Sequence, residues 1–141
     1  MKITHPGRIG FNLTLIARTR RAFVANAMSE YGFAPPMYEI AIYIWRHPGG
    51  SQDAVTEATL FDKATVARGA KKLETLGYIR RQCSERDRRQ YELYLTEKGE
   101  VLASDAYRAF TQWTDILTRG LSETEKQYAS ALLERMARNI D

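Results

Sequence analysis

Apolar residues recur at helical spacing through the first part of the chain. The spacing predicts a long amphipathic helix over residues 9–31, and it is carried by Ile9, Leu13, Ile16, Phe23 and Val24. Gly32 ends this helix. A second helix over residues 36–46 is apolar nearly all round, and we therefore expect it at the centre of the core.

The middle of the chain changes from helical spacing to alternation. Ser51 is a favourable cap for a short third helix through residue 58, and Asp62 is one for a fourth helix that runs to about residue 76. Two helices joined by so short a turn predict a helix-turn-helix. Two strands follow, over residues 78–83 and 90–95, and the second alternates clearly. A hairpin directly after a helix-turn-helix indicates a winged helix.

Two more helices complete the pattern. Thr96 caps a fifth helix that runs to about residue 119, and the capping box at residues 122–125 opens a sixth. The predicted fold is mainly α, with a winged helix-turn-helix core over residues 33–96. The apolar stripes of the flanking helices, at residues 1–31 and 97–141, exceed what this core can bury. We therefore expect one domain over residues 1–141, and a homodimer whose terminal helices interlock.

Positive charge is concentrated in one segment. Residues 62–89 hold nine Lys or Arg and four acids, which gives +5, whereas the whole chain of 141 residues carries +4. The rest of the chain therefore sums to −1, and the basic character belongs to the helix and hairpin. A local basic patch of this kind favours a polyanionic partner, of which double-stranded DNA is the commonest.

Composition excludes several other classes. One cysteine argues against disulfides and against a cysteine-based zinc site, and His5 and His47 stand too far apart to indicate a metal site, so no metal or cofactor is expected. The chain has no run of apolar residues that would span a membrane, and its first residues lack the apolar core of a secretion signal, so a cytoplasmic location is expected. The chain contains none of the common catalytic motifs, and we do not expect an enzyme.

The fourth helix and the hairpin tip offer the candidate DNA contacts. Opposite the apolar face of that helix lie Lys63, Arg68 and Lys71, with Thr65 at the side. Small side chains between them would let the helix enter a major groove. At the tip, three arginines surround Asp87, namely Arg86, Arg88 and Arg89, and Asp87 is expected to brace them. The alternative for both elements is an ordinary basic surface facing solvent.

Two stretches of the sequence resemble a known family. DKATVARGAKKLETLGYIRR and ERDRRQYELYLTEKG are similar to the winged helix of the MarR/SlyA family of bacterial transcription regulators. The resemblance implies that Thr65, Arg68 and Lys71 read the major groove and that Arg89 enters the minor groove or braces Asp87. It also implies that the start of the third helix, Ser51 and Gln52, contacts phosphate. Gly69, inside the expected reading helix, and Ala67 depart from the family pattern.

The expected function is that of a homodimeric DNA-binding transcription regulator, a repressor on a pseudo-palindromic operator. Regulators of this family often bind a small aromatic or anionic effector, and four residues are candidates for such a pocket: Arg18, Met37, Tyr38 and Trp45. The alternative for these residues is plain core packing. The alternative for the whole chain is a winged-helix module that binds protein or RNA without effector control, and salt-dependent binding to a palindromic DNA duplex distinguishes the two.

Overall fold

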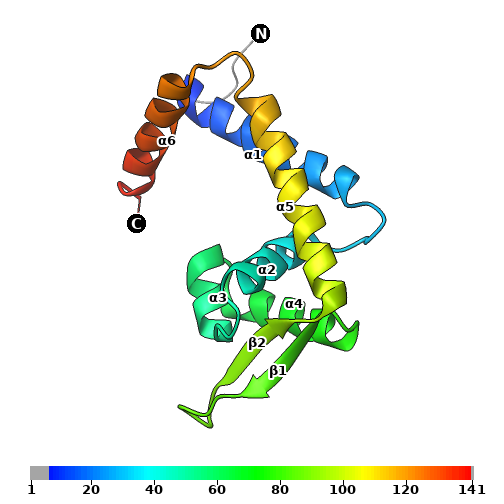
Figure 1. The fold of residues 1–141 in the computed structure, drawn as a ribbon. Coiled ribbons are helices and arrows are strands. Elements are labelled where there is room, and N and C mark those ends of the chain that lie inside the picture. Colours follow the sequence, from blue (N-terminus) through cyan, green and yellow to red (C-terminus); the bar gives the residue numbers. More distant parts are fainter. Residues whose placement is uncertain (1–6, 141) are drawn as a thin grey trace.

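The computed structural model describes residues 7–140, so His5 lies outside the described chain. It confirms the predicted mainly α fold, with six helices and one antiparallel hairpin (Figure 1). In chain order the elements are α1 (Arg8–Ala27), α2 (Pro35–Arg46), α3 (Gln52–Thr59), α4 (Lys63–Thr75), β1 (Ile79–Cys83), β2 (Tyr91–Leu95), α5 (Glu97–Leu117) and α6 (Glu123–Ala137).

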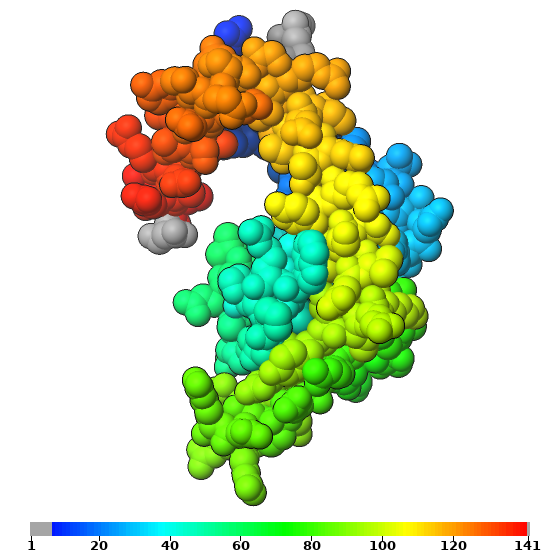
Figure 2. Space-filling model, viewed as in Figure 1, coloured from blue at the N-terminus to red at the C-terminus, as the bar shows by residue number. Residues whose placement is uncertain are grey.

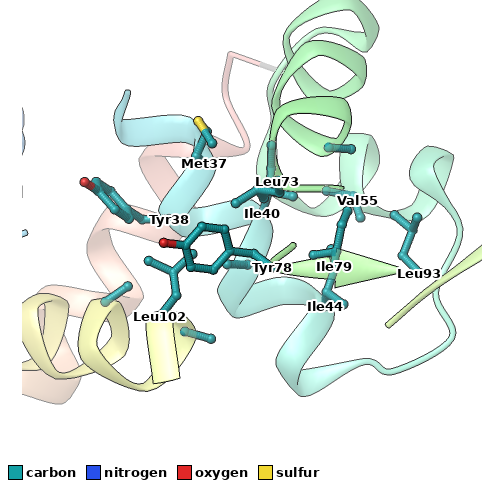
Figure 3. Packing of buried hydrophobic residues seen from close by; sticks show 14 of the residues in the cluster. Met37, Tyr38, Ile40, Ile44, Val55, Leu73, Tyr78, Ile79, Leu93 and Leu102 are labelled. Carbon is teal, nitrogen blue, oxygen red and sulfur yellow. The ribbon is translucent and has the colours of Figure 1, made fainter. Parts of the chain in front are cut away.

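The core forms around α2, as its all-round apolar sequence predicted. This helix contacts α1, α3, α4, α5 and β2. Figure 3 shows the side chains that meet there, and the most deeply buried include Ile40, Ile44, Leu73, Leu93 and Leu102. Because α4 and the hairpin both pack on this one cluster, the helix-turn-helix and the wing are held as a single lobe.

Four helices begin where the sequence predicts. A side-chain oxygen accepts a hydrogen bond from a first-turn amide at each of the expected caps, Ser51, Asp62, Thr96 and Ser122. The capping box is complete, because the Glu125 carboxylate also accepts a hydrogen bond from the Ser122 amide at 2.7 Å. These bonds satisfy amides that have no partner within their own helix.

The first helix ends at Ala27, earlier than its periodicity predicts. The chain then turns, and the ring of Tyr31 packs 6.4 Å from that of Tyr78, while its hydroxyl donates to Asp105 at 2.7 Å. Burial, followed by this hydrogen bond, raises the pKa of Tyr31 well above its usual range. The predicted end was wrong because Tyr31 sits at a helical spacing but serves a contact with α5.

One residue, Thr96, connects the wing to α5. Its hydroxyl donates to the Gly77 carbonyl at 2.6 Å, and its amide donates to the Tyr78 carbonyl at 3.0 Å. Gly99, in the first turn of α5, lies so close to the Tyr78 carbonyl that no side chain fits there. Residues 95–99, Leu-Thr-Glu-Lys-Gly, therefore form a closely packed connection between the lobe and α5.

The outer helices leave the lobe and form an open hook. In Figure 1, α5 rises from the lobe beside α1, and α6 stands apart, while Figure 2 shows a hollow between α6 and the lobe. No residue of α6 is buried. Apolar side chains exposed on these helices include Ile9, Leu13, Ile116, Leu117, Tyr128, Leu132 and Leu133. No helix within residues 7–140 combines the length and the apolar character that a membrane crossing requires.

Candidate nucleic-acid interface

Helix α4 separates a buried face from a basic one. Its buried face is made by Val66, Gly69, Ala70 and Leu73. The predicted contacts Lys63, Arg68 and Lys71 are exposed, and Thr65 is half-buried at the edge. The cations are therefore on the side that faces away from α2, as a helix entering a groove requires.

Gly69 explains one departure from the family pattern. A β-carbon added at this position would lie 2.7 Å from Cδ1 of Ile40, which is itself fully buried in α2. Glycine therefore lets α4 approach α2 closely. An internal glycine lowers helix stability by about 1 kcal/mol relative to alanine, and this packing offsets the loss.

The first turn of α4 is held by Asp62. The Thr65 amide donates to the Asp62 carboxylate at 2.7 Å, and this bond is the main reason that the pKa of Asp62 lies below its usual value. Lys63 lies 3.7 Å from Asp53 of α3 in an exposed ion pair. Thr65 also accepts a weak hydrogen bond from the Arg68 guanidinium at 3.5 Å.

An ion pair that sequence reasoning missed joins α4 to the wing. The Nε atom of Arg81, on β1, lies 2.7 Å from a carboxylate oxygen of Glu74, in the last turn of α4. Both side chains are partly exposed. The two residues are seven positions apart in the chain, and the turn between α4 and β1 brings their charges together. The pair links the candidate reading helix to the hairpin.

The wing tip is held by its backbone. Asp87 accepts a hydrogen bond from the Arg89 amide at 3.0 Å, so its carboxylate contacts a peptide group and not a guanidinium. Arg86, Arg88 and Arg89 are exposed, and within residues 7–140 none of them has an ion-pair partner. Three cations therefore remain available to an outside anion.

The start of α3 lies beside the wing. A groove of about 190 Å³ brings Ser51 and Gln52 together with Arg89 and Gln90. The Gln52 side-chain oxygen is buried there and has no hydrogen-bond partner among the described residues. The structure thus gathers α3, α4 and the wing into one basic region, although these contacts with DNA stay predictions.

The four candidate effector residues do not meet around one cavity. Met37 and Tyr38 are buried in the core (Figure 3). The Tyr38 hydroxyl donates to the Met28 carbonyl at 3.2 Å, and burial raises its pKa. Trp45 packs against Tyr107 at 5.9 Å, and Arg18 is exposed on α1. Helical spacing placed these residues on the right elements but not on a shared surface.

A different cavity, of about 600 Å³, lies among α1, α2, α5 and the turn before α4. Its lining is mostly apolar, with two arginines and one acid: Leu13, Ile16, Ala17, Arg20, Arg21, Val24, Pro35, Pro36, Glu39, Phe61 and Phe110. Arg20 lies 3.5 Å from Glu39 and 4.5 Å above the ring of Phe110. No sequence motif includes these residues, so the cavity is visible only in the folded chain.

The described residues offer no metal centre. Within residues 7–140 no three or more His, Cys, Asp or Glu side chains gather in a way that would hold an ion. His47 packs instead against the Tyr43 ring, with centroids 4.6 Å apart.

Comparisons with known proteins agree with this geometry. The MarR family model matches residues 31–90. The HTH-type transcriptional regulator BilQ of Clostridium symbiosum is 32% identical over 116 residues, which cover 82% of this chain and 81% of the relative. The crystal structure of the transcriptional regulator SlyA has a TM-score of 0.86 at 27% identity, and covers 95% of this chain and 94% of that one.

A third comparison shares the fold and was solved with nucleic acid. The structure of a Listeria monocytogenes protein described as a MarR family regulator, complexed with a 26mer DNA, has a TM-score of 0.87 at 22% identity. It covers 96% of this chain and 90% of that one. The relatives and neighbours are transcription regulators and not enzymes.

Proposed function

Because this chain belongs to the MarR family of DNA-binding transcription regulators, we propose that it acts as a homodimeric repressor on a pseudo-palindromic operator in the cytoplasm. One observation carries the proposal. The exposed cations of α4 lie next to a wing tip whose three arginines have no ion-pair partner within the described chain. Such an arrangement suits a helix in the major groove and an arginine in the adjacent minor groove.

Operator selection tests this function directly. Duplexes bound by the full chain are recovered from a random pool, and the affinity of the selected duplex is measured against salt concentration. With about four phosphate contacts per subunit, the slope of log K against log [salt] for a dimer is about −7. An RNA duplex of the same sequence serves as the control, because its major groove does not admit the helix. A slope near zero, or equal affinity for RNA, would refute the proposal.

The homodimer is supported by the apolar surface of the outer helices. Exposed large side chains lie near the start of α1, at the end of α5 and along α6, where a second copy would cover them. Large exposed apolar patches on a soluble protein often mark sites of interaction with another protein. A two-fold axis through these helices would set two copies of α4 about one turn of DNA, roughly 34 Å, apart.

The cavity lined by Phe61 and Phe110 supports control by a small aromatic anion. Aromatic rings and apolar helix faces suit the body of such a compound, and Arg20 and Arg21 suit its carboxylate. Phe61 immediately precedes Asp62, the cap of α4. A compound that displaces Phe61 would therefore shift the start of the reading helix, and it releases DNA only if it binds that shifted geometry more tightly.

A panel of aromatic carboxylates tests the effector. We expect one of them to raise the melting temperature and to lower operator affinity about 5- to 150-fold, the usual range of coupling between two sites. Arg20→Ala should lose both effects. Arg18→Ala is the matched control, because Arg18 lies on the same helix outside the cavity lining. A panel in which no compound does both would contradict effector control.

A further inference from the structure

Ser84 stands out at the point where β1 gives way to the wing tip. Among residues 7–140 it is the one buried residue with a polar, non-aromatic side chain, with 8% of its surface exposed. Its amide donates to the Gln90 carbonyl at 3.0 Å, which closes the base of the tip. A hydroxyl withdrawn from solvent in this way needs partners nearby, and the tip supplies them.

The hydrogen-bond partners of the Ser84 hydroxyl are backbone amides of the wing tip. Its Oγ atom accepts hydrogen bonds from the amides of Arg86 at 3.3 Å and Asp87 at 3.4 Å. Asp87 continues the frame, because its carboxylate accepts from the Arg89 amide and its carbonyl accepts from the Gln90 amide, each at 3.0 Å. Every bond in this frame joins a backbone amide, and none uses a guanidinium.

We propose that Ser84 is a positioning residue for DNA binding, whose hydroxyl holds the wing backbone so that Arg86, Arg88 and Arg89 are presented together to a minor groove. The inference rests on the proposed function, because it assigns the wing to DNA. Three like charges on one short tip repel each other, and a tip without the frame would spread them. Binding would then have to order the backbone, whereas the frame supplies that order beforehand.

Four variants of the full chain test the assignment: Ser84→Ala, Ser84→Thr, the triple change of the three wing arginines to alanine, and that triple change combined with Ser84→Ala. The probes are dA·dT and dG·dC duplexes about 30 base pairs long, roughly three helical turns, because A-tracts have the narrow minor groove that attracts arginine. Ser84→Ala should weaken dA·dT binding roughly fivefold per wing, the factor that one typical hydrogen bond corresponds to. Ser84→Thr, which keeps the hydroxyl, should restore it.

The background without wing arginines separates positioning from a general loss of structure. There Ser84→Ala should have no further effect, since it acts through side chains that are gone. Wild-type affinity in Ser84→Ala, or an equal loss in both backgrounds, would overturn the assignment. If the wild-type protein binds neither duplex in a salt-dependent way, the proposed function itself fails.

A measurement on the wild-type protein keeps the inference testable if Ser84→Ala does not fold. The amides of Arg86 and Asp87, which donate to Ser84, should exchange with solvent more slowly than the amide of Glu85 in the same tip. Equal exchange at all three amides would show that the frame does not form, and the assignment would be wrong.

Discussion

At the scale of single residues, the close approach of α4 to α2 depends on the absence of one methyl group. Gly69 faces Ile40 where the two helices cross, and the candidate DNA contacts lie on the opposite side of the same helix. The distance between α4 and α2, and with it the projection of the basic face, therefore depends on Gly69. This residue lies on the side of α4 away from the proposed DNA contacts.

Gly69→Ala is expected to lower the free energy of unfolding by about 1 kcal/mol. Alanine gains about 1 kcal/mol in helix propensity, but a methyl group 2.7 Å from Ile40 Cδ1 overpacks a buried contact, which typically costs about 1–3 kcal/mol, and the packing effect prevails. Denaturant titration measures the change. Ile40→Val removes the clashing carbon, so Gly69→Ala should cost less in that background. A more stable Gly69→Ala protein would contradict the packing described.

The cap of α4 predicts a pH dependence. The hydrogen bond from the Thr65 amide lowers the pKa of Asp62 in the folded state, relative to about 3.9 in the unfolded chain. The stabilisation is therefore present above the unfolded value and is lost as pH falls through the folded value. Asp62→Asn keeps an acceptor that does not titrate. The melting temperature of the wild type should fall towards that of Asp62→Asn between about pH 7 and pH 3, and a constant difference would count against the ionised cap.

At the scale of elements, α4 and the wing are proposed to make two different kinds of DNA contact. Both pack on the shared core, and the Arg81–Glu74 ion pair links them, so they should act as one surface but contribute differently. A side chain in a major groove reads base edges, whereas an arginine in a minor groove senses mainly groove width.

Arg68→Ala and Arg89→Ala should therefore differ in kind. Loss of Arg68 should cost about 1–3 kcal/mol per half-site and relax sequence preference, whereas loss of Arg89 should weaken all duplexes more evenly and reduce the preference for A-tracts. Competition binding with single-base operator variants measures both. Arg119→Ala removes the same charge near the far end of α5 and serves as the control. Wild-type affinity in both test variants would show that neither element is placed correctly.

At the scale of the whole molecule, α6 contributes nothing to the core of its own chain. It has no buried residue, yet a capping box opens it and apolar side chains follow one of its faces. A helix of this length gains most of its stability from packing. We therefore propose that a second copy of the chain covers it.

Leu132→Asp should convert the dimer into a monomer or an aggregate. Leu132 is half-exposed on α6, and a charge there would have to be buried in the proposed interface, which costs several kcal/mol. Sedimentation at micromolar concentration measures the change. Gln127→Asp places the same charge on the opposite side of α6 and should leave the dimer intact. A folded wild-type monomer under these conditions would end the dimer proposal.

Local signals in the sequence predicted the helices and strands better than the contacts between them. The helices, the hairpin and the four caps depend on spacing and on neighbours within a turn, and these were confirmed. Long-range contacts were not visible. Tyr31 lies beyond the end of α1 and contacts Asp105, and the cavity beside Phe61 had no local signature. These features depend on which faces meet after folding, and periodicity does not specify that.

The close connection at Thr96 couples the orientation of α5 to that of the lobe. Because a single tightly bonded residue separates β2 from α5, and because α5 also packs against α2, we expect a rotation of α5 to move the wing and α4 with it. The 21 residues of α5 span about 31 Å at 1.5 Å per residue. A tilt of about 10° at the distal end therefore displaces the lobe by about 5 Å, which is roughly one and a half base-pair steps at 3.4 Å each. We therefore expect substitutions in the distal half of α5 to change the half-site spacing that the proposed dimer accepts.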